Sequence, residues 1–227
     1  MDKRFQTGCP LVHCITNYVA MEFTANAILA VGARPLMSFS SDEMEEIVSK
    51  CDSLLVNIGC IDIQQKEAAM KAVSAAGKYG KPWVLDPVGI QLTKLRFDTC
   101  KELIAQNPPA VIKSNSEEAV VISEILDNSS SAKDVVLITT GETDVISQGD
   151  RTARVAYGNP IMKKVTAMGC AAGGILAAYL AKCEDAFQAS VDAMTLFGRA
   201  GEKAAEKSNN GTGTFKTLFL DELRRLS

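Results

Sequence analysis

Short, nearly uninterrupted apolar runs alternate with helix-length segments along most of this 227-residue sequence, and this alternation limits the possible folds most. Strands that are apolar at almost every position are typical of a parallel sheet that is buried on both faces. The sequence therefore predicts an α/β fold, with a mostly parallel central sheet and helices on both faces. The predicted strands are Pro35–Phe39, Ser53–Ile58, Trp83–Asp86, Ala110–Ile112 and Val135–Thr139.

The segments between these strands carry helix signals. Ser40 and Glu43 have the spacing of a capping box, and Gly80 follows a long helical pattern as a stop signal. From Gly169 the chain is predicted to be helical to its end, with breaks near Glu184 and between Ser208 and Thr214. The other predicted helices are Asn17–Val31, Ser40–Lys50, Ile61–Tyr79, Thr93–Ala105 and one that starts at Asn115. A hairpin of Val145–Ser147 and Arg154–Tyr157 is expected around Gly149-Asp150.

The amino-acid composition limits the classes of protein to which this sequence can belong. Hydrophobic residues make up 47% of the chain and charged residues 22%, which suits one globular domain over residues 1–227. The net charge of −3 and the lack of a basic stripe argue against nucleic acid as a partner. The uncharged stretch Ala167–Ala181 is too short and too glycine-rich to cross a membrane. Seven scattered cysteines without a Cys-x-x-Cys pair indicate reduced thiols, so we expect a cytoplasmic protein.

Ligands of such sheets bind beyond the carboxyl ends of the strands, so we expect the site in the loops that follow them. The turn from Val165 to Cys170 leads into a helix of small residues. The free amides and the dipole of a helix N-terminus form an anion site, which suits a phosphoryl group in transfer. Cys170 would lie in the first turn, where the pKa of a thiol is usually lowered, and could accept a proton from a substrate hydroxyl. The simpler alternative is a small buried apolar residue, followed by a Gly- and Ala-rich run that permits close packing.

Acidic and basic side chains follow two of the predicted strands. Asp86 ends a strand and could hold Mg²⁺, or could simply organise the Asp-Pro turn. Lys113 follows the next strand and could reach a phosphate. Glu118 could be the second magnesium carboxylate, but Asn115 and Glu118 also have capping-box spacing. The two roles of Glu118 are compatible only if one carboxylate oxygen stays free.

Two further positions carry weaker signals. Thr140, in Thr139-Thr140-Gly141-Glu142, could contact nucleotide phosphates, although an ordinary strand-to-hairpin turn is the simpler interpretation. His13 is the single histidine, which excludes a His-rich metal site, and a local hydrogen bond is expected for it. The sequence has neither a Walker-type loop nor a dinucleotide-binding glycine fingerprint.

Taken together, these segments resemble the hydroxyethylthiazole kinases of the ribokinase-like superfamily. The two most specific segments are His13-Cys14-Ile15-Thr16-Asn17 and Lys81-Pro82-Trp83-Val84-Leu85-Asp86-Pro87-Val88-Gly89. The resemblance covers nearly the whole chain in order. Further matches are Phe23-Thr24-Ala25-Asn26-Ala27, Gly32-Ala33-Arg34-Pro35-Leu36-Met37, Leu55-Val56-Asn57-Ile58-Gly59, Thr140-Gly141-Glu142, Val165-Thr166 to Gly169-Cys170, and a weaker echo at Gly211-Thr212-Gly213-Thr214-Phe215.

The resemblance implies an activity and a set of site residues. The expected reaction is phosphorylation of the hydroxyethyl alcohol of 4-methyl-5-(2-hydroxyethyl)thiazole by ATP with Mg²⁺, in thiamine salvage or biosynthesis. It also implies a homotrimer with active sites between subunits, with thiazole contacts from Asn17, Val19 and Met37 of one subunit and from the Cys170 region, including Ala172, of another. The other implied residues are the magnesium ligands Asp86 and Glu118, the phosphate-binding Lys113 and Thr140, the turn residues Ala167, Met168 and Gly169, and Cys170 near the reacting hydroxyl.

The sequence departs from the family pattern at the turn and at the basic residue. The family's Gly-Thr-Gly-Cys reads Ala167-Met168-Gly169-Cys170, and an alanine would obstruct the turn if its position requires a positive φ. Lys113 replaces an arginine, which keeps the charge and loses the bidentate fork. Two alternatives remain open: a thiazole-binding trimer with weak or lost transfer, and a related kinase for another small alcohol.

Overall fold

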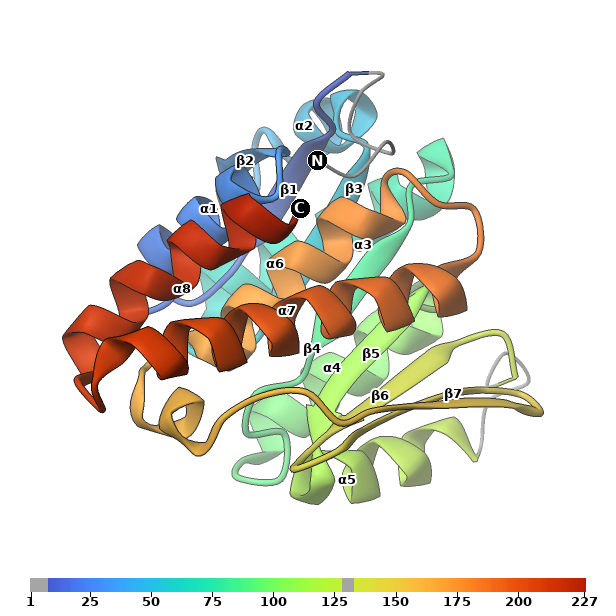
Figure 1. Ribbon diagram of the computed structural model, residues 1–227. Helices are drawn as coiled ribbons and strands as arrows, with labels where there is room; N and C mark the ends of the chain where they lie inside the picture. The colour runs from blue at the N-terminus through green and yellow to red at the C-terminus, as the bar shows by residue number, and fades with distance from the viewer. Residues whose placement is uncertain (1–7, 128–132) are drawn as a thin grey trace.

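The computed structural model describes residues 8–127 and 133–227, and Figure 1 shows one twisted sheet covered by helices. The strands lie in the order β2-β1-β3-β4-β5-β6-β7-β8. All pairs from β2 to β6 are parallel, and β6, β7 and β8 are antiparallel. The mostly parallel α/β fold predicted from the apolar runs is confirmed. The strands are β1 (Leu11–Ile15), β2 (Arg34–Met37), β3 (Ser53–Asn57), β4 (Trp83–Asp86), β5 (Val111–Asn115), β6 (Val136–Thr140), β7 (Asp144–Gln148) and β8 (Arg151–Val155).

Two separate apolar clusters bury the two faces of the sheet. One cluster contains the inner sides of α1, α6, α7 and α8, which lie in front of the strands in Figure 1, and the other contains those of α2, α3, α4 and α5. Burial on both faces explains why β3 and β4 are apolar at nearly every position. The helices are α1 (Met21–Ala30), α2 (Met44–Lys50), α3 (Ile63–Tyr79), α4 (Lys94–Gln106), α5 (Ser116–Leu126), α6 (Met168–Leu180), α7 (Ala186–Ser208) and α8 (Thr212–Leu226), and Pro160–Lys164 form a 3₁₀ helix.

Strand β1 is not among the strands predicted from the sequence, although it pairs with both β2 and β3 near one edge of the sheet. Its five residues include a histidine, which broke the apolar run by which the other strands were found. His13 is nevertheless fully buried, and its Nε2 lies 3.0 Å from the carbonyl oxygen of Ser38. The local hydrogen bond expected for this histidine is therefore present.

Two predicted helix starts are wrong. Helix α1 begins at Met21 instead of Asn17, because Asn17 forms a turn in which its side-chain oxygen accepts the amide of Ala20 at 2.9 Å. Helix α2 begins at Met44, and its N-cap Glu43 makes no side-chain cap. The predicted capping box of Ser40 and Glu43 is absent, because the Glu43 carboxylate accepts the hydroxyl of Ser38 instead.

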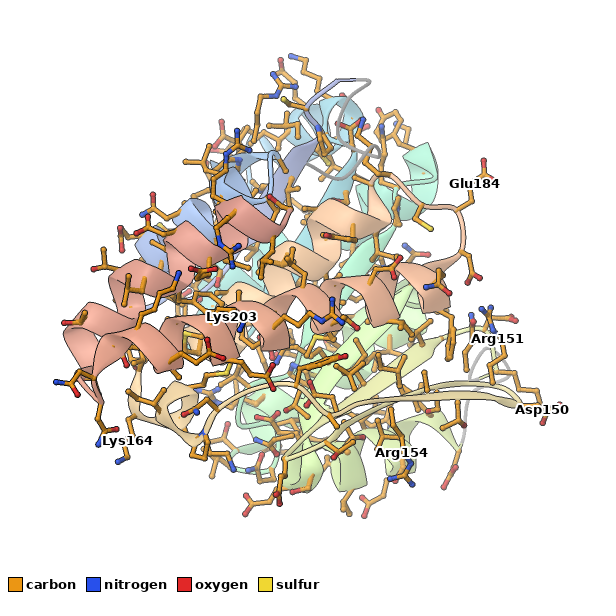
Figure 2. The ribbon with its side chains drawn as sticks, viewed as in Figure 1. Asp150, Arg151, Arg154, Lys164, Glu184 and Lys203 are labelled. Atoms are coloured by element: carbon orange, nitrogen blue, oxygen red, sulfur yellow. The ribbon has the colours of Figure 1, made fainter. Side chains whose placement is uncertain are left out.

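Other predicted boundaries are close to those observed. Gly80 ends α3 in the left-handed conformation, and the breaks near Glu184 and after Ser208 separate α6, α7 and α8. The second strand of the hairpin begins at Arg151, three residues before the predicted start. Figure 2 shows Asp150 and Arg151 at the tip of this hairpin. Arg151 also forms an ion pair of 2.8 Å with Asp185, which ties the hairpin to the start of α7. The serine run Ser129–Ser131, whose sequence predicts a short connection, lies outside the described residues.

Candidate active site

The carboxyl ends of β3, β4 and β5 bring three buried polar side chains together beside α6. Parallel register places Asn57 opposite Asp86, and Asn57 Nδ2 donates to Asp86 Oδ2 at 2.7 Å. Lys113 Nζ lies 3.2 Å from the other oxygen, Asp86 Oδ1. All three residues are at most 5% exposed. A carboxylate and an ammonium are thus held almost without water at the edge of the sheet where ligands of this architecture bind.

Burial and the mutual attraction of Asp86 and Lys113 have opposite effects on the pKa values of both side chains. Burial raises the pKa of Asp86, the Lys113 ammonium opposes that rise, and the negative charge of Glu118 adds to it. Burial alone would lower the pKa of Lys113, but the charges of Asp86, Cys170 and Glu118 raise it on balance. Lys113 is therefore held as a cation. Asp86 Oδ1 is buried and accepts no hydrogen bond of standard geometry from the described residues, so it has capacity for a further cation.

The carboxylate of Glu118 binds main-chain amides at the start of α5 and in the loop after β4. Its Oε2 accepts the amide of Asn115 at 2.9 Å, and the Asn115 side chain accepts the amide of Glu118, which confirms the capping box. Its Oε1 accepts the amide of Gly89, also at 2.9 Å. Both oxygens of Glu118 accept a hydrogen bond. Neither oxygen is therefore entirely free for magnesium, which was the condition for Glu118 to act both as a cap and as a metal ligand. Each oxygen still has a second lone pair for a cation or a water bound to one.

The first turn of α6 faces Lys113. A Cβ built on Gly169 would lie 3.9 Å from Lys113 Nζ, and no side chain caps the helix at Ala167. The first amides of such a helix have no acceptor within it and attract an anion. Ala167 has a φ of 69°, in the left-handed region, so the turn does require the positive φ that was considered from the sequence. An alanine there adopts a conformation that costs roughly 1–2 kcal/mol relative to a right-handed one.

The small residues of α6 serve packing as well as the site. A Cβ on Gly173 would lie 3.0 Å from Leu55 Cδ1 and 3.6 Å from Asp86 Oδ2, and one on Gly174 would lie 2.8 Å from Thr24 Cγ2. The alternative that this run permits close packing is therefore confirmed for the two glycines. The same close approach brings the helix to the carboxylate of Asp86, so packing and site formation go together.

Cys170 lies in this first turn, but its pKa is not lowered as expected. Burial and the charge of Asp86 raise the pKa of its thiol, and hydrogen bonding from Asn17 and the charge of Lys113 oppose the rise without reversing it. The thiol accepts a hydrogen bond from Asn17 Nδ2 at 3.3 Å. Asn17 and Cys170 therefore meet within one chain, and the expectation that they come from different subunits is wrong for this pair.

The remaining predicted residues surround this centre in different ways. Thr140 ends β6, and its hydroxyl donates to the carbonyl of Ser114 at 3.2 Å, which leaves its oxygen able to accept. Met168 and Ala172 are buried within α6, so neither presents an open side chain. Val19 is 66% exposed, and Met37 is partly buried at the end of β2.

Sequence reasoning missed two residues that organise the site. Asn57 belongs to a segment that matches the family, but no role was predicted for it, although it contacts Asp86 and Asn17 directly. Arg96, in α4, donates to the carbonyl oxygens of Ile58 at 3.0 Å, of Gly59 at 2.6 Å and of Val88. Its guanidinium thus joins the loops after β3 and β4. The sequence held a signal for Asn57, a polar residue that ends an apolar strand, but none for Arg96, which acts from a different element.

The donor set fits magnesium better than a metal that requires a protein cage. No group of three or more His, Cys, Asp or Glu side chains that could hold a metal occurs in residues 8–127 and 133–227. Mg²⁺ is usually bound through one or two carboxylates together with substrate phosphates and waters. Asp86 Oδ1, whose ion-pair partner among the described residues is the Lys113 ammonium, and the remaining lone pairs of Glu118 meet that requirement.

Comparison with known proteins gives one consistent match. The model of the hydroxyethylthiazole kinase family matches residues 3–133 and 121–227. A hydroxyethylthiazole kinase of Thermoanaerobacter pseudethanolicus is 40% identical over 96% of this chain and 90% of its own length. The solved hydroxyethylthiazole kinase of Pyrococcus horikoshii superposes with a TM-score of 0.92 at 34% identity, over 98% of this chain and 91% of that one. A ribokinase-like superfamily protein of Enterococcus faecalis superposes with a TM-score of 0.70 at 14% identity, over 96% of this chain and 87% of that one, which shows a shared fold.

Proposed function

The chain belongs to the hydroxyethylthiazole kinase family, and on that premise we propose that it transfers a phosphoryl group from ATP to 4-methyl-5-(2-hydroxyethyl)thiazole. The protein is a kinase, as its relatives are. In the proposed reaction the primary alcohol oxygen attacks the terminal phosphorus of ATP. The bond to the bridging oxygen breaks, ADP leaves, and the hydroxyl proton passes to a base or to water. The product serves the salvage or biosynthesis of thiamine.

One observation carries this proposal: Lys113 Nζ lies between the Asp86 carboxylate and the uncapped start of α6. A buried ammonium next to free backbone amides attracts phosphate oxygens strongly, because little water screens the charges. Positioning and electrostatics supply most of the catalysis in phosphoryl transfer. The arrangement therefore suits a phosphate donor better than an uncharged ligand.

Each residue then has a separate task. Lys113 offsets charge on the nucleotide phosphates, and the amides from Ala167 to Cys170 stabilise the phosphoryl group in transfer. The oxygen of Thr140 is available at the edge of the same region. Cys170 is the candidate base for the alcohol proton, and since a loose transition state asks little of a base, we expect Cys170→Ala to slow turnover without abolishing it.

Asp86 and Glu118 would hold Mg²⁺, which supplies charge neutralisation of the nucleotide phosphates when it is bound. Their positions support this assignment. Asp86 Oδ1 contacts the Lys113 ammonium and keeps a lone pair for a further cation, and Glu118 is anchored by two main-chain amides that fix its direction. A cation at Asp86 would also neutralise the Asp86 carboxylate, which is paired with the Lys113 ammonium in this structure.

The exposed apolar residues next to Asn17 support a trimer in which a neighbouring subunit completes the site. Tyr18 is 56% exposed and Val19 is 66% exposed, although both lie within two residues of the buried Asn17. A second copy would remove these side chains from water and supply a wall for the thiazole. All seven cysteines are free thiols, which supports a reducing, cytoplasmic location.

The proposal is tested by incubating the purified protein with Mg-ATP and each of two alcohols, hydroxyethylthiazole and a hydroxymethylpyrimidine. Mass spectrometry then measures the phosphate monoesters formed. We expect the thiazole phosphate to form much faster. Faster phosphorylation of the pyrimidine identifies a kinase for another alcohol, and tight thiazole binding without ATP turnover identifies a binding protein that has lost transfer.

A further inference from the structure

Two buried asparagines connect Asp86 to Cys170 through an unbroken series of hydrogen bonds. Asn57 Nδ2 donates to Asp86 Oδ2 at 2.7 Å, Asn17 Nδ2 donates to Asn57 Oδ1 at 3.0 Å, and Asn17 Nδ2 also donates to Cys170 Sγ at 3.3 Å. We call Asn17 and Asn57 the amide chain. It joins the loop after β1, the end of β3, the end of β4 and the start of α6.

The direction of every bond in the amide chain is fixed by the main chain. The amide of Gly59 donates to Asn57 Oδ1 at 2.9 Å, and a backbone N–H can only donate, so this atom must be the oxygen. The amide of Ala20 fixes Asn17 Oδ1 in the same way at 2.9 Å. Neither side chain can flip without placing two donors against each other. An N–H group therefore always faces Asp86, and another always faces Cys170.

The amide chain is also confined sterically. Asn17 is 6% exposed and Asn57 is 2% exposed. A Cβ on Gly59 would lie 2.8 Å from Asn17 Nδ2 and 3.0 Å from Asn57 Oδ1, so only glycine leaves room for both amides. Arg96 holds the same glycine in place through its carbonyl oxygen, at 2.6 Å. The close approach of Gly59, held by Arg96, thus fixes the positions of both amide side chains.

This arrangement has one consequence for the thiol and one for the substrate. A donor that faces sulfur favours the thiolate over the thiol, which counteracts the effect of burial on Cys170. Both hydrogens of Asn17 Nδ2 are used within the chain, so a substrate can be offered only the second lone pair of Asn17 Oδ1. Asn17 can then accept a hydrogen bond from a substrate, but it has no N–H left to donate to one.

From these contacts we infer that Asn17 and Asn57 are positioning residues, whose fixed amide directions hold Asp86 and present a hydrogen-bond donor to Cys170. The inference rests on the proposed function only for the use of that thiol in catalysis. The geometry itself concerns the protein without substrates, so it can fail or hold independently of the kinase activity.

The test measures how fast iodoacetamide alkylates Cys170 as a function of pH, without nucleotide or thiazole, by mass spectrometry of the peptide that contains Cys170. Asn17→Asp keeps an oxygen for the amide of Ala20 and removes both donors. We expect the midpoint of its Cys170 profile to rise by at least about one pH unit, a tenfold loss of thiolate below the midpoint. Asn57→Leu should raise the midpoint by less, because Asn17 loses the acceptor that keeps its amide directed.

Asn26→Asp is the matched control. It adds the same charge on α1, where Asn26 donates to the carbonyl of Glu22. Its Cys170 profile should coincide with that of the wild type, and the exposed Cys9 should react equally in every protein. An unchanged midpoint in Asn17→Asp, or an equal rise in Asn26→Asp, would overturn the inference.

A second measurement needs no variant. In the wild-type protein, NMR should detect the side-chain NH₂ protons of Asn17 and Asn57 exchanging slowly with water, since both groups are buried and hydrogen-bonded. Exchange as fast as that of an exposed asparagine would show that the amide chain is not formed, even if the variants fail to fold.

Discussion

Ala167 carries the main local strain next to the site, because its φ of 69° is one that residues other than glycine rarely adopt. Glycine at this position removes a penalty of about 1–2 kcal/mol but costs roughly 0.5–1 kcal/mol in chain entropy. We therefore expect Ala167→Gly to raise the free energy of unfolding by about 0.5 kcal/mol and to keep or increase turnover. Urea unfolding and initial-rate kinetics measure both.

Ala178→Gly provides the control for this change. Ala178 is buried in the interior of the same helix, so glycine there should lower the free energy of unfolding by about 1–2 kcal/mol. If Ala167→Gly destabilises the protein as much as Ala178→Gly, the left-handed turn at the start of α6 is not the conformation in solution.

His13 makes the free energy of unfolding depend on pH. Burial lowers the pKa of its imidazole to about 4, and the carbonyl of Ser38 only partly offsets this effect. As the pH falls below about 6.5, the unfolded state takes up a proton that the folded state refuses, so stability falls until the pH approaches about 4. The total loss from this residue is about 3 kcal/mol.

His13→Gln should remove this contribution while keeping a donor for Ser38. Denaturant unfolding at about pH 7 and at about pH 4 measures the difference between the two proteins. We expect the wild type to lose about 3 kcal/mol more than the variant over this range. Equal losses would mean that His13 is solvated and titrates normally.

At the scale of elements, the start of α5 combines a structural and a chemical task in Glu118. Glutamine at this position has one oxygen for two main-chain donors, the amides of Gly89 and Asn115, so one donor loses its acceptor. We expect Glu118→Gln to cost about 1–2 kcal/mol of stability and to lower turnover at least tenfold, the latter through the lost charge. Thermal unfolding and kinetics at saturating magnesium separate the two effects.

Glu117→Gln is the matched comparison, since Glu117 is exposed on the same turn and accepts a hydrogen bond from the side chain of Gln91. It should retain the turnover of the wild type within about twofold. Equal turnover in the two variants would remove Glu118 from the magnesium site and leave it as a cap alone.

The sequence predicted elements well where burial on both faces made a run uniformly apolar. Trp83–Asp86 was found to the residue, whereas β1 was missed because His13 interrupts its run. Asp86, Lys113 and the start of α6 were all expected near one edge, because parallel strands end together. The contacts of Asn57 and Arg96 could not be predicted, since they depend on the distance between loops that are far apart in sequence. The raised pKa of Cys170 was also missed, because it follows from burial and from the nearby charge of Asp86.

At the scale of the whole molecule, the proposed trimer predicts that assembly and activity are lost together. Val19→Asp places a charge on the exposed apolar patch beside the site, so the variant should be monomeric and strongly impaired in turnover. The wild type should have about three times the mass of the 24.3 kDa chain in sedimentation equilibrium.

Val120→Asp tests whether any exposed apolar residue would behave in this way. Val120 is 61% exposed on α5, and its replacement should leave mass and turnover unchanged. A wild-type protein that is monomeric and fully active would contradict the shared site.

The central claim is that the buried pair of Asp86 and Lys113 beside the start of α6 forms a phosphoryl-transfer site. The most direct measurement is the initial rate at which wild-type and Asp86→Asn proteins, both verified as folded, convert hydroxyethylthiazole and Mg-ATP to the phosphate monoester. We predict measurable product from the wild type and a rate at least about 100-fold lower from Asp86→Asn, because the isosteric amide cannot supply the negative charge. Equal rates from the two proteins, or no product from the wild type, would contradict the account.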